Sequence, residues 1–268
     1  MTRTVKAPCY MSALVLTEDG SSDAFATVRH LVKHLLQIVD PATDIQHIEF
    51  EPATDEHAKA AAVANKWRSS EQRDRRQIVA LFRVIAGRLA EAGGFVFFHF
   101  DGDTTWSDRD ASVTSAQFHS IVDHGVRQTL LMRLAKRRLS ESATTEFIRE
   151  AMTRLLLVSP HYSVEAWCLQ NTMKARELCA KHHGGVHRKV FDDWEADRGQ
   201  LDEIEKPKKQ SCLGAEHNRV LSGVGFPRDE VFKAGKSFAA TALVMSERGA
   251  LTNALTMTHT YPKPESTC

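Results

Sequence analysis

Short apolar runs alternate along the chain with longer amphipathic stretches, and this pattern predicts strands that alternate with helices. Apolar runs cover residues 13–17, 95–100 and 155–158. Each run is too short for a typical helix, and each meets a charged, glycine or proline residue nearby, which indicates a buried strand. A weaker alternation over residues 44–50 predicts one more strand.

The stretches between these runs carry apolar residues at three- and four-residue steps, which predicts helices. Helices are expected from about Ser22 to Pro41, over residues 71–92, 115–138 and 142–153, and from Ser163 onward. Strands that alternate with helices favour an α/β fold. We therefore expect a mostly parallel four-stranded sheet flanked by helices.

The last third of the chain is less regular and predicts a separate segment. It contains a charged stretch that runs to Lys209 and a final helical pattern over residues 236–248. We expect residues 1–180 to form the α/β core. Residues 181–268 are expected to form a mainly helical segment that packs on it, with a flexible tail from Thr258.

Charge and cysteine content narrow the classes of protein. The 35 basic and 34 acidic residues nearly cancel, so any phosphate-binding surface must be local. No apolar run has the length of a membrane span, and no signal peptide is evident. Five cysteines without tight spacing fit reduced thiols, which favours a cytoplasmic protein.

Carboxylates follow three of the four predicted strands. Glu18 and Asp19 follow the first, Asp101 and Asp103 follow the run at 95–100, and Glu165 comes shortly after the last. Sites in open parallel sheets lie at the carboxyl ends of strands, so these groups are expected to converge. Converging carboxylates repel one another unless a cation lies between them, and their oxygens suit Mg²⁺ or Mn²⁺.

The same acidic groups resemble the motifs of Toprim domains. Asp19-Gly20-Ser21-Ser22-Asp23 after a strand resembles the first motif, and Asp101-Gly102-Asp103 resembles the D-x-D motif. Ser163–Leu169, in which Trp167 follows Glu165, looks like the third motif of small Toprim-like proteins of bacterial defence loci. It is also similar to the nuclease domain of overcoming-lysogenization-defect proteins. Phe226-Pro227 and residues 235–239 resemble the closing segment of the same small proteins.

The resemblance implies a divalent-metal-dependent nuclease that acts on DNA or RNA. It also implies an effector of anti-phage defence that works with an ABC- or AAA-type ATPase partner. The metal ligands would be Asp101, Asp103, Glu165 and either Glu18 or Asp19. The family's first motif begins with glutamate, and the register here leaves both residues open. Homo-oligomers also stay open.

Cationic residues that could stabilise the transition state lie in the last third of the chain. Lys233 and Lys236 are the first candidates, with Lys206, Lys208 and Lys209 behind them. The basic run at 136–138 suits a nucleic-acid backbone or, equally, the end of a helix. Two other readings remain: a non-catalytic scaffold that binds metal, nucleic acid or a partner, and a hydrolase of small phosphates.

Three further patterns carry less weight. Gly235-Lys236-Ser237 lacks the earlier glycine of a P-loop, because position 230 is Glu230. Cys179, His182, His183 and His187 would need Cys168 or Cys212 to complete a zinc site, so a polar surface loop is the favoured interpretation. His99, inside an apolar run, is interpreted as a core histidine whose hydrogen bonds are satisfied.

Overall fold

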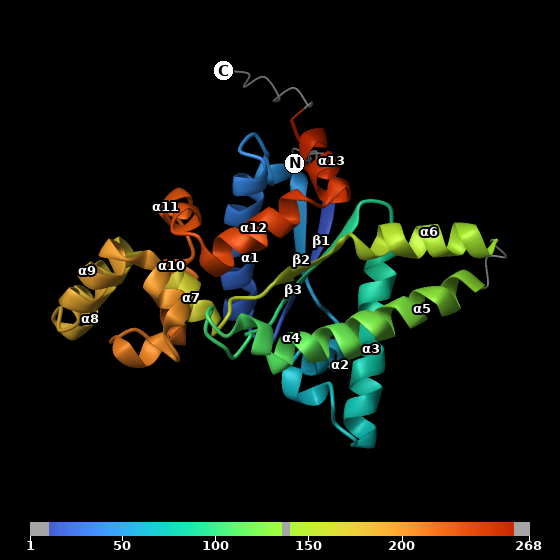
Figure 1. The fold of residues 1–268 in the computed structure, drawn as a ribbon, viewed down its shortest axis with the longest axis horizontal. Coiled ribbons are helices and arrows are strands. Elements are labelled where there is room, and N and C mark those ends of the chain that lie inside the picture. The colour runs from blue at the N-terminus through green and yellow to red at the C-terminus, as the bar shows by residue number, and fades with distance from the viewer. Residues whose placement is uncertain (1–10, 136–139, 260–268) are drawn as a thin grey trace, which may run out of the picture.

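A computed structural model describes residues 11–135 and 140–259, and its centre is a parallel sheet (Figure 1). The strands are β1 (Met11–Thr17), β2 (Ile48–Pro52), β3 (Gly94–His99) and β4 (Leu155–Val158), in the order β2-β1-β3-β4. The expected α/β class, with a parallel four-stranded sheet flanked by helices and a helical C-terminal segment, is confirmed. The basic run at 136–138 lies outside the described residues.

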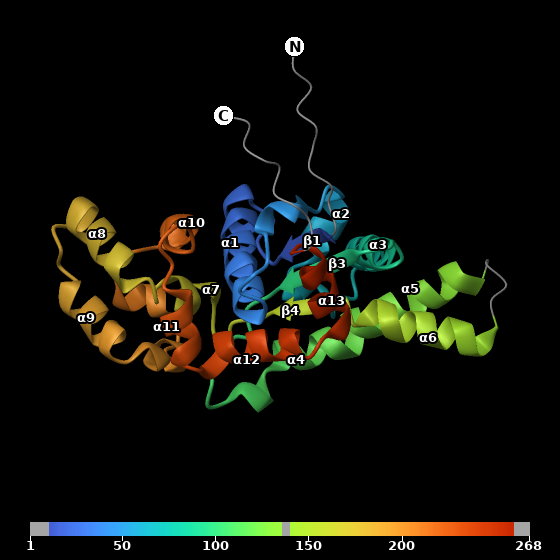
Figure 2. The same ribbon diagram turned by 90° about the horizontal axis from the view of Figure 1, so that it is seen from above.

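On one face of the sheet, Ala13, Val15, Phe95 and Phe97 point into a core. The helices that contribute side chains to this core are α1 (Ser22–Val39), α7 (Val164–Cys168), α8 (Thr172–His183), α9 (Arg188–Ala196), α10 (Asn218–Leu221), α11 (Arg228–Lys233), α12 (Lys236–Ser246) and α13 (Gly249–Met257). On this face, α1 and α12 lie against the strands, and α8 and α9 lie beyond the sheet edge (Figure 2).

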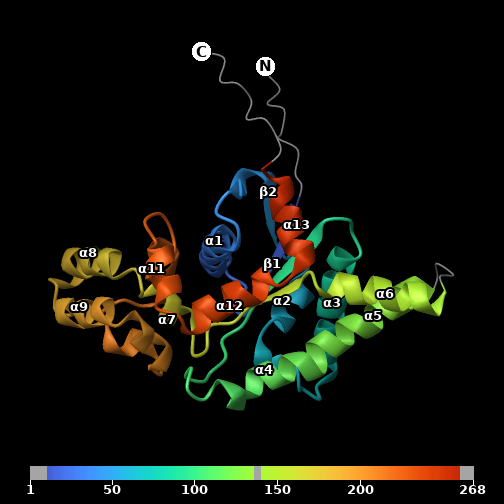
Figure 3. The same cartoon turned by 45° about the horizontal axis from the view of Figure 1, so that its top comes forward.

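The middle of the chain covers the other face. Leu14, Leu16, Val96 and Phe98 point into this second core, where the ring of Trp67 packs edge-on against Phe98. The helices are α2 (Glu56–Ala61), α3 (Gln72–Leu89), α4 (Val113–Gln117), α5 (His124–Ala135) and α6 (Glu141–Met152). Figure 3 shows α5 and α6 side by side, extending away from the sheet. Because β1 and β3 are buried on both faces, apolar residues run without interruption over residues 13–16 and 95–98.

Several element boundaries differ from the predicted ones. The predicted strand at 44–50 starts with a 3₁₀ turn (Ile45–His47), and only Ile48–Pro52 pairs with β1. The single helix predicted over 115–138 is divided into α4, a π-helical segment (Phe118–Asp123) and α5. The helix predicted over 236–248 ends at Ser246, and α13 follows from Gly249.

The segment after residue 181 contributes to the same core as the sheet. Phe191, Trp194, Phe238 and Leu251 are buried with side chains of β1 and β3. The division predicted between residues 180 and 181 stays a prediction, and it falls within α8. In the described part of the chain no helix combines the length and apolarity needed to span a bilayer.

The connections between strands place a crevice at the carboxyl ends of β1 and β3. After β1 the chain crosses one face through α1 to reach β2 on one side. After β2 it crosses the opposite face through α3 to reach β3 on the other side. Such a reversal leaves the loops after β1 and β3 diverging, which is where open α/β sheets bind ligands.

Candidate functional site

A pocket of about 400 Å³ opens at this crevice, and we call it the carboxylate pocket. Four acidic groups predicted from the sequence line it: Glu18, Asp19, Asp101 and Glu165. His99, Lys208 and Asn218 also line it. The pocket is therefore formed by the ends of β1 and β3, by the first turn of α7 and by residues of the C-terminal segment.

Glu18 and Asp101 join the ends of β1 and β3 directly. The backbone N–H of Asp101 donates to Oε2 of Glu18 at 3.1 Å. Burial raises the pKa of Glu18, a hydrogen bond from Asp101 opposes this rise, and the negative charges of Asp101 and Asp103 add to it. A carboxylate held in this way gains from a nearby cation, which would lower its pKa again.

Asp101 also connects the strand end to α7. Its Oδ1 accepts from the backbone N–H of Val164 at 3.0 Å, and the same oxygen lies 3.5 Å from Nε2 of His99. Val164 is the first residue of α7, so this contact sets the position of the next residue, Glu165. One carboxyl group thus links the orientation of two other polar side chains in the pocket.

His99 is buried, as predicted, but it is not satisfied. The residue is only 5% exposed, and neither ring nitrogen makes a hydrogen bond. It is the last residue of β3 and lies two positions before Asp101, so both side chains reach the same side of the chain. A buried imidazole that makes no hydrogen bond is costly, so both ring nitrogens of His99 have capacity to bind a further group.

Glu165 is buried against two residues of the C-terminal segment. Its Oε1 lies 3.5 Å from Nζ of Lys208 and 3.4 Å from Nδ2 of Asn218. Only 5% of Glu165 is exposed, whereas the Lys208 side chain is about half exposed. Lys208 therefore brings a positive charge to the mouth of the pocket while one carboxylate stays inside.

The structure separates the two candidates for the first ligand. Glu18 faces Asp101, whereas Oδ1 of Asp19 accepts from the backbone N–H of Ser21 at 2.9 Å. Asp19 is exposed at the rim and shapes the turn that leads into α1, whose N-cap is Ser21. Glu18 is therefore the better placed ligand for a cation held by Asp101.

Asp103 does not line the carboxylate pocket. Its φ of 53° turns the chain out of the extended geometry that would have aligned it with Asp101. Partial burial raises the pKa of Asp103, the charge of Asp101 raises it further, and a hydrogen bond with Thr114 opposes both. Gly102 lets the backbone after β3 lie close to the backbone at His161, because a Cβ at position 102 would lie 2.5 Å from the carbonyl oxygen of His161.

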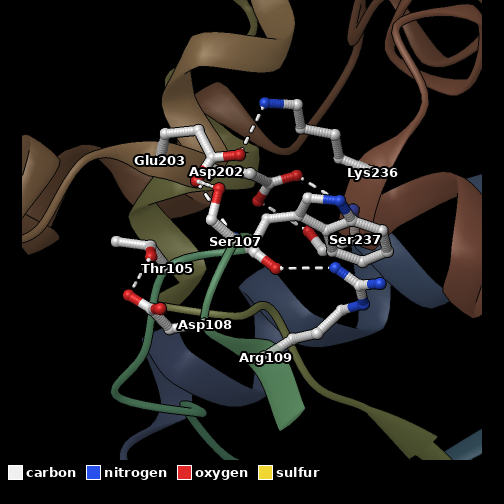
Figure 4. A network of polar contacts seen from close by, with 9 residues as sticks. Thr105, Ser107, Asp108, Arg109, Asp202, Glu203, Lys236 and Ser237 are labelled. Carbon is white, nitrogen blue, oxygen red and sulfur yellow. Dashed lines mark hydrogen bonds and ion pairs between the residues drawn. The ribbon is translucent and has the colours of Figure 1, made fainter. Parts of the chain in front are cut away.

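The two cations ranked first from the sequence lie elsewhere. Lys233 is exposed on α11. Nζ of Lys236 lies 2.8 Å from Oε1 of Glu203, and the other carboxylate oxygen, Oε2, accepts from Oγ of Ser107 (Figure 4). Neither lysine lines the pocket. Lys208, one of the lysines ranked behind them, is the lysine beside Glu165, and the catalytic role of each lysine stays a prediction.

The P-loop-like segment is occupied by a side chain of the protein. The carboxylate of Asp202 accepts from the backbone N–H of Ser237 at 3.0 Å and from its hydroxyl at 2.6 Å (Figure 4). This contact fills the N-terminus of α12, where a phosphate would otherwise bind. The network attaches the loop after β3 to the C-terminal segment instead.

Asn218 is the pocket residue that sequence reasoning missed. It follows Glu165 by more than fifty positions and belongs to no recognisable motif, so only the fold brings it there. No protein-family model, curated protein or solved structure compared with this chain matches it, and the resemblance to Toprim-like proteins stays a prediction.

Proposed function

We propose that this protein is a divalent-metal-dependent nuclease that hydrolyses phosphodiester bonds in the carboxylate pocket. The observation that carries the proposal is the convergence of Glu18, Asp101 and Glu165 beside a buried histidine that makes no hydrogen bond. Three carboxylates in one pocket repel one another, and a cation would remove that cost. Net attraction for an anionic substrate then depends on the cation and on Lys208.

The donor set fits magnesium or manganese. Carboxylate oxygens of Glu18, Asp101 and Glu165 are the hard ligands that both ions prefer, and the imidazole of His99 is also acceptable to manganese. These four residues would hold the ion. A cation there would supply positive charge to phosphate oxygens and make water a stronger nucleophile.

The remaining contacts act on the substrate and orient the carboxylates. Lys208, half exposed at the pocket mouth, is positioned to attract a phosphate and to offset charge that develops during hydrolysis. Asn218 orients Glu165 through its amide. Nε2 of His99 lies 3.5 Å from Oδ1 of Asp101, so the imidazole would share the ion with this carboxylate and help to orient it.

A hydrolase of small phosphates is a second candidate. The pocket volume of about 400 Å³ lies in the range of sites that enclose small ligands. The same carboxylates and Lys208 would then act on a nucleotide or another small phosphate instead of a polymer. A non-catalytic role in binding metal or nucleic acid is a third, and it predicts binding without turnover.

The biological setting proposed here comes from the Toprim resemblance alone. An effector of anti-phage defence that cuts DNA or RNA would need restraint in the resting cell. An ATPase partner that controls access to the pocket would provide it. Cleavage that appears only when such a partner and ATP are present would support this part of the proposal.

A cleavage assay tests the function. Purified full-length protein should cut DNA or RNA in the presence of Mg²⁺ or Mn²⁺, and Asp101→Asn should abolish the cut. Asp110→Asn is the matched control, because Asp110 is an exposed acid in the same loop and does not line the pocket. Equal activity of both variants, or hydrolysis of nucleotides alone, would refute the nuclease assignment.

A further inference from the structure

A second polar cluster lies in the C-terminal segment, between helices α8 and α9 and the loop before α10. It consists of Cys179, His187 and Cys212, and we call it the thiol cluster. The ligand atoms of these residues all lie within 4.8 Å of one another, and the two sulfur atoms are 2.7 Å apart. Both thiols are free. The cluster shares no residue with the carboxylate pocket.

The local chain geometry explains how the three residues meet. Helix α8 ends at His183, and Gly184 and Gly185 turn the chain with positive φ values of 63° and 76°. The turn places His187 at the start of α9, back beside Cys179 of α8. Cys212 belongs to a separate loop, which follows the 3₁₀ turn at Pro207–Gln210 and meets α8 at Cys179.

The cluster has unused binding capacity. Cys179 is fully buried, and Nδ1 of His187 is buried without a hydrogen bond. His182 and His183, which the sequence grouped with these residues, are exposed. Cys168 is buried elsewhere in the core, and the third ligand is Cys212. The preferred interpretation of a polar surface loop therefore holds for His182 and His183 and is wrong for Cys179, which is buried.

We propose that Cys179, His187 and Cys212 bind one zinc ion. Two thiolates and one imidazole are soft and borderline ligands that suit Zn²⁺ and not Mg²⁺. Each thiol loses its proton to solvent when the metal binds, and the ion neutralises the two thiolates that result. Three protein ligands leave one tetrahedral position for water.

Zinc at this place would fix one side of the carboxylate pocket. Cys212 lies between Lys208 and Asn218 in the sequence, and both of those residues contact Glu165. A zinc ion would join their loop to the α8–α9 pair, which packs on the core through Phe191 and Trp194. This consequence rests on the proposed function, whereas zinc binding itself does not.

The metal content of the purified full-length chain tests the proposal. Protein kept reduced and supplied with Zn²⁺ should carry one zinc per chain by plasma mass spectrometry. His187→Ala and Cys212→Ser should each lose it. Cys168→Ala is the matched cysteine control and should keep it, because Cys168 is not in the cluster. Glu165→Gln should also keep it, which separates this result from a failure of the nuclease assignment.

A spectroscopic measurement guards against variants that fail to fold. Wild-type protein loaded with Co²⁺ should show the thiolate-to-cobalt charge-transfer absorption expected of two cysteine ligands, and added Zn²⁺ should remove it. Wild-type protein that is folded and reduced but binds neither metal would overturn the proposal. A molecular mass lower by two hydrogen atoms, which would mark a stable Cys179–Cys212 disulfide in reducing buffer, would also overturn it. The same holds if the Cys168→Ala variant loses zinc as the His187→Ala and Cys212→Ser variants do.

Discussion

The carboxylate pocket brings together carboxylates that repel one another, and the thiol cluster contains a buried histidine nitrogen without a hydrogen bond. The two regions differ in the type of ligand atom and in the elements that hold those atoms. The pocket offers hard oxygens from the ends of parallel strands, where Asp101 is fixed by a backbone N–H of α7. The cluster offers soft sulfur and nitrogen atoms from a helix, a helix start and a loop. The difference in ligand type and in supporting elements would keep the two proposed metals apart in one fold.

The two regions are also connected. The loop that carries Cys212 supplies Lys208 and Asn218 to the carboxylate pocket. Strand ends are held by the sheet, so the acidic side of the pocket is preorganised. The loop is not part of the sheet and is held through Leu213, which is buried in the core. We infer that zinc at Cys212 would add a second attachment. The comparison therefore predicts unequal effects when each region is altered.

After the complete loss of cleavage expected for Asp101→Asn, the largest effect is expected from Glu165→Gln. Loss of one buried carboxylate should lower kcat/KM for phosphodiester cleavage by about 10³-fold, or about 4 kcal/mol in transition-state energy. Glutamine keeps the shape and can still meet Asn218, so the free energy of unfolding should change little. Glu177→Gln on the exposed side of α8 is the control. Zinc content should stay at one per chain; if it fell with activity, the two regions would not be separate.

The next effect distinguishes the two lysines. Lys208→Met should lower cleavage by about 10²-fold, because it removes the cation beside Glu165. Lys236→Met should leave activity within about threefold, since its partner is Glu203 and it lies outside the pocket. Steady-state rates at several salt concentrations would show this. The opposite ranking would restore the order predicted from the sequence.

Removal of zinc should have a smaller effect on activity. A zinc-selective chelator, with Mg²⁺ kept in excess, should reduce cleavage by about tenfold, the size typical of groups that orient a ligand indirectly. In Lys208→Met protein the chelator should cause little further loss, because both changes act on the same loop. A full double-mutant cycle with Cys212→Ser measures this coupling. Independent, additive losses would show that the thiol cluster does not position Lys208.

The smallest effect concerns a contact outside both regions, between α1 and the C-terminal segment. His34 on α1 lies 3.0 Å from the carbonyl oxygen of Ser222, just after α10, and its ring stacks on Phe226. Burial lowers the pKa of His34, and the charge of Arg228 lowers it further. Below about pH 6.5 the unfolded chain therefore binds a proton at His34 more readily than the folded chain does. The free energy of unfolding is highest above this pH and falls as the pH is lowered.

Replacement of His34 by glutamine should make the pH dependence of unfolding shallower. The difference in slope between pH 7.5 and 5.5 can reach at most about 1.4 kcal/mol per pH unit, the limit for one proton. Urea unfolding at a series of pH values measures it. An unchanged slope in His34→Gln would assign the acid sensitivity to other groups, such as His30, whose pKa burial also lowers.

Much of the fold could be predicted from local patterns. The apolar runs at 95–100 and 155–158 appear as β3 and β4 within a residue or two, and the Gln72–Leu89 helix follows its periodicity. Side-chain spacing reports which residues face a core, so strands and helices are recoverable. The π-helical segment at Phe118–Asp123 was not, because its hydrogen-bond register depends on packing around Phe118 and Val122.

The candidate site divides in the same way. The sequence by itself determined that carboxylates follow the strands, because each lies next to an apolar run that must be buried. Tertiary structure decided between Glu18 and Asp19, turned Asp103 aside and placed Lys208, not Lys236, in the pocket. It also joined Cys212 to Cys179 and His187. These choices depend on contacts between residues far apart in the chain, and local hydrophobic patterning contains no information on which distant loop will reach a given strand end.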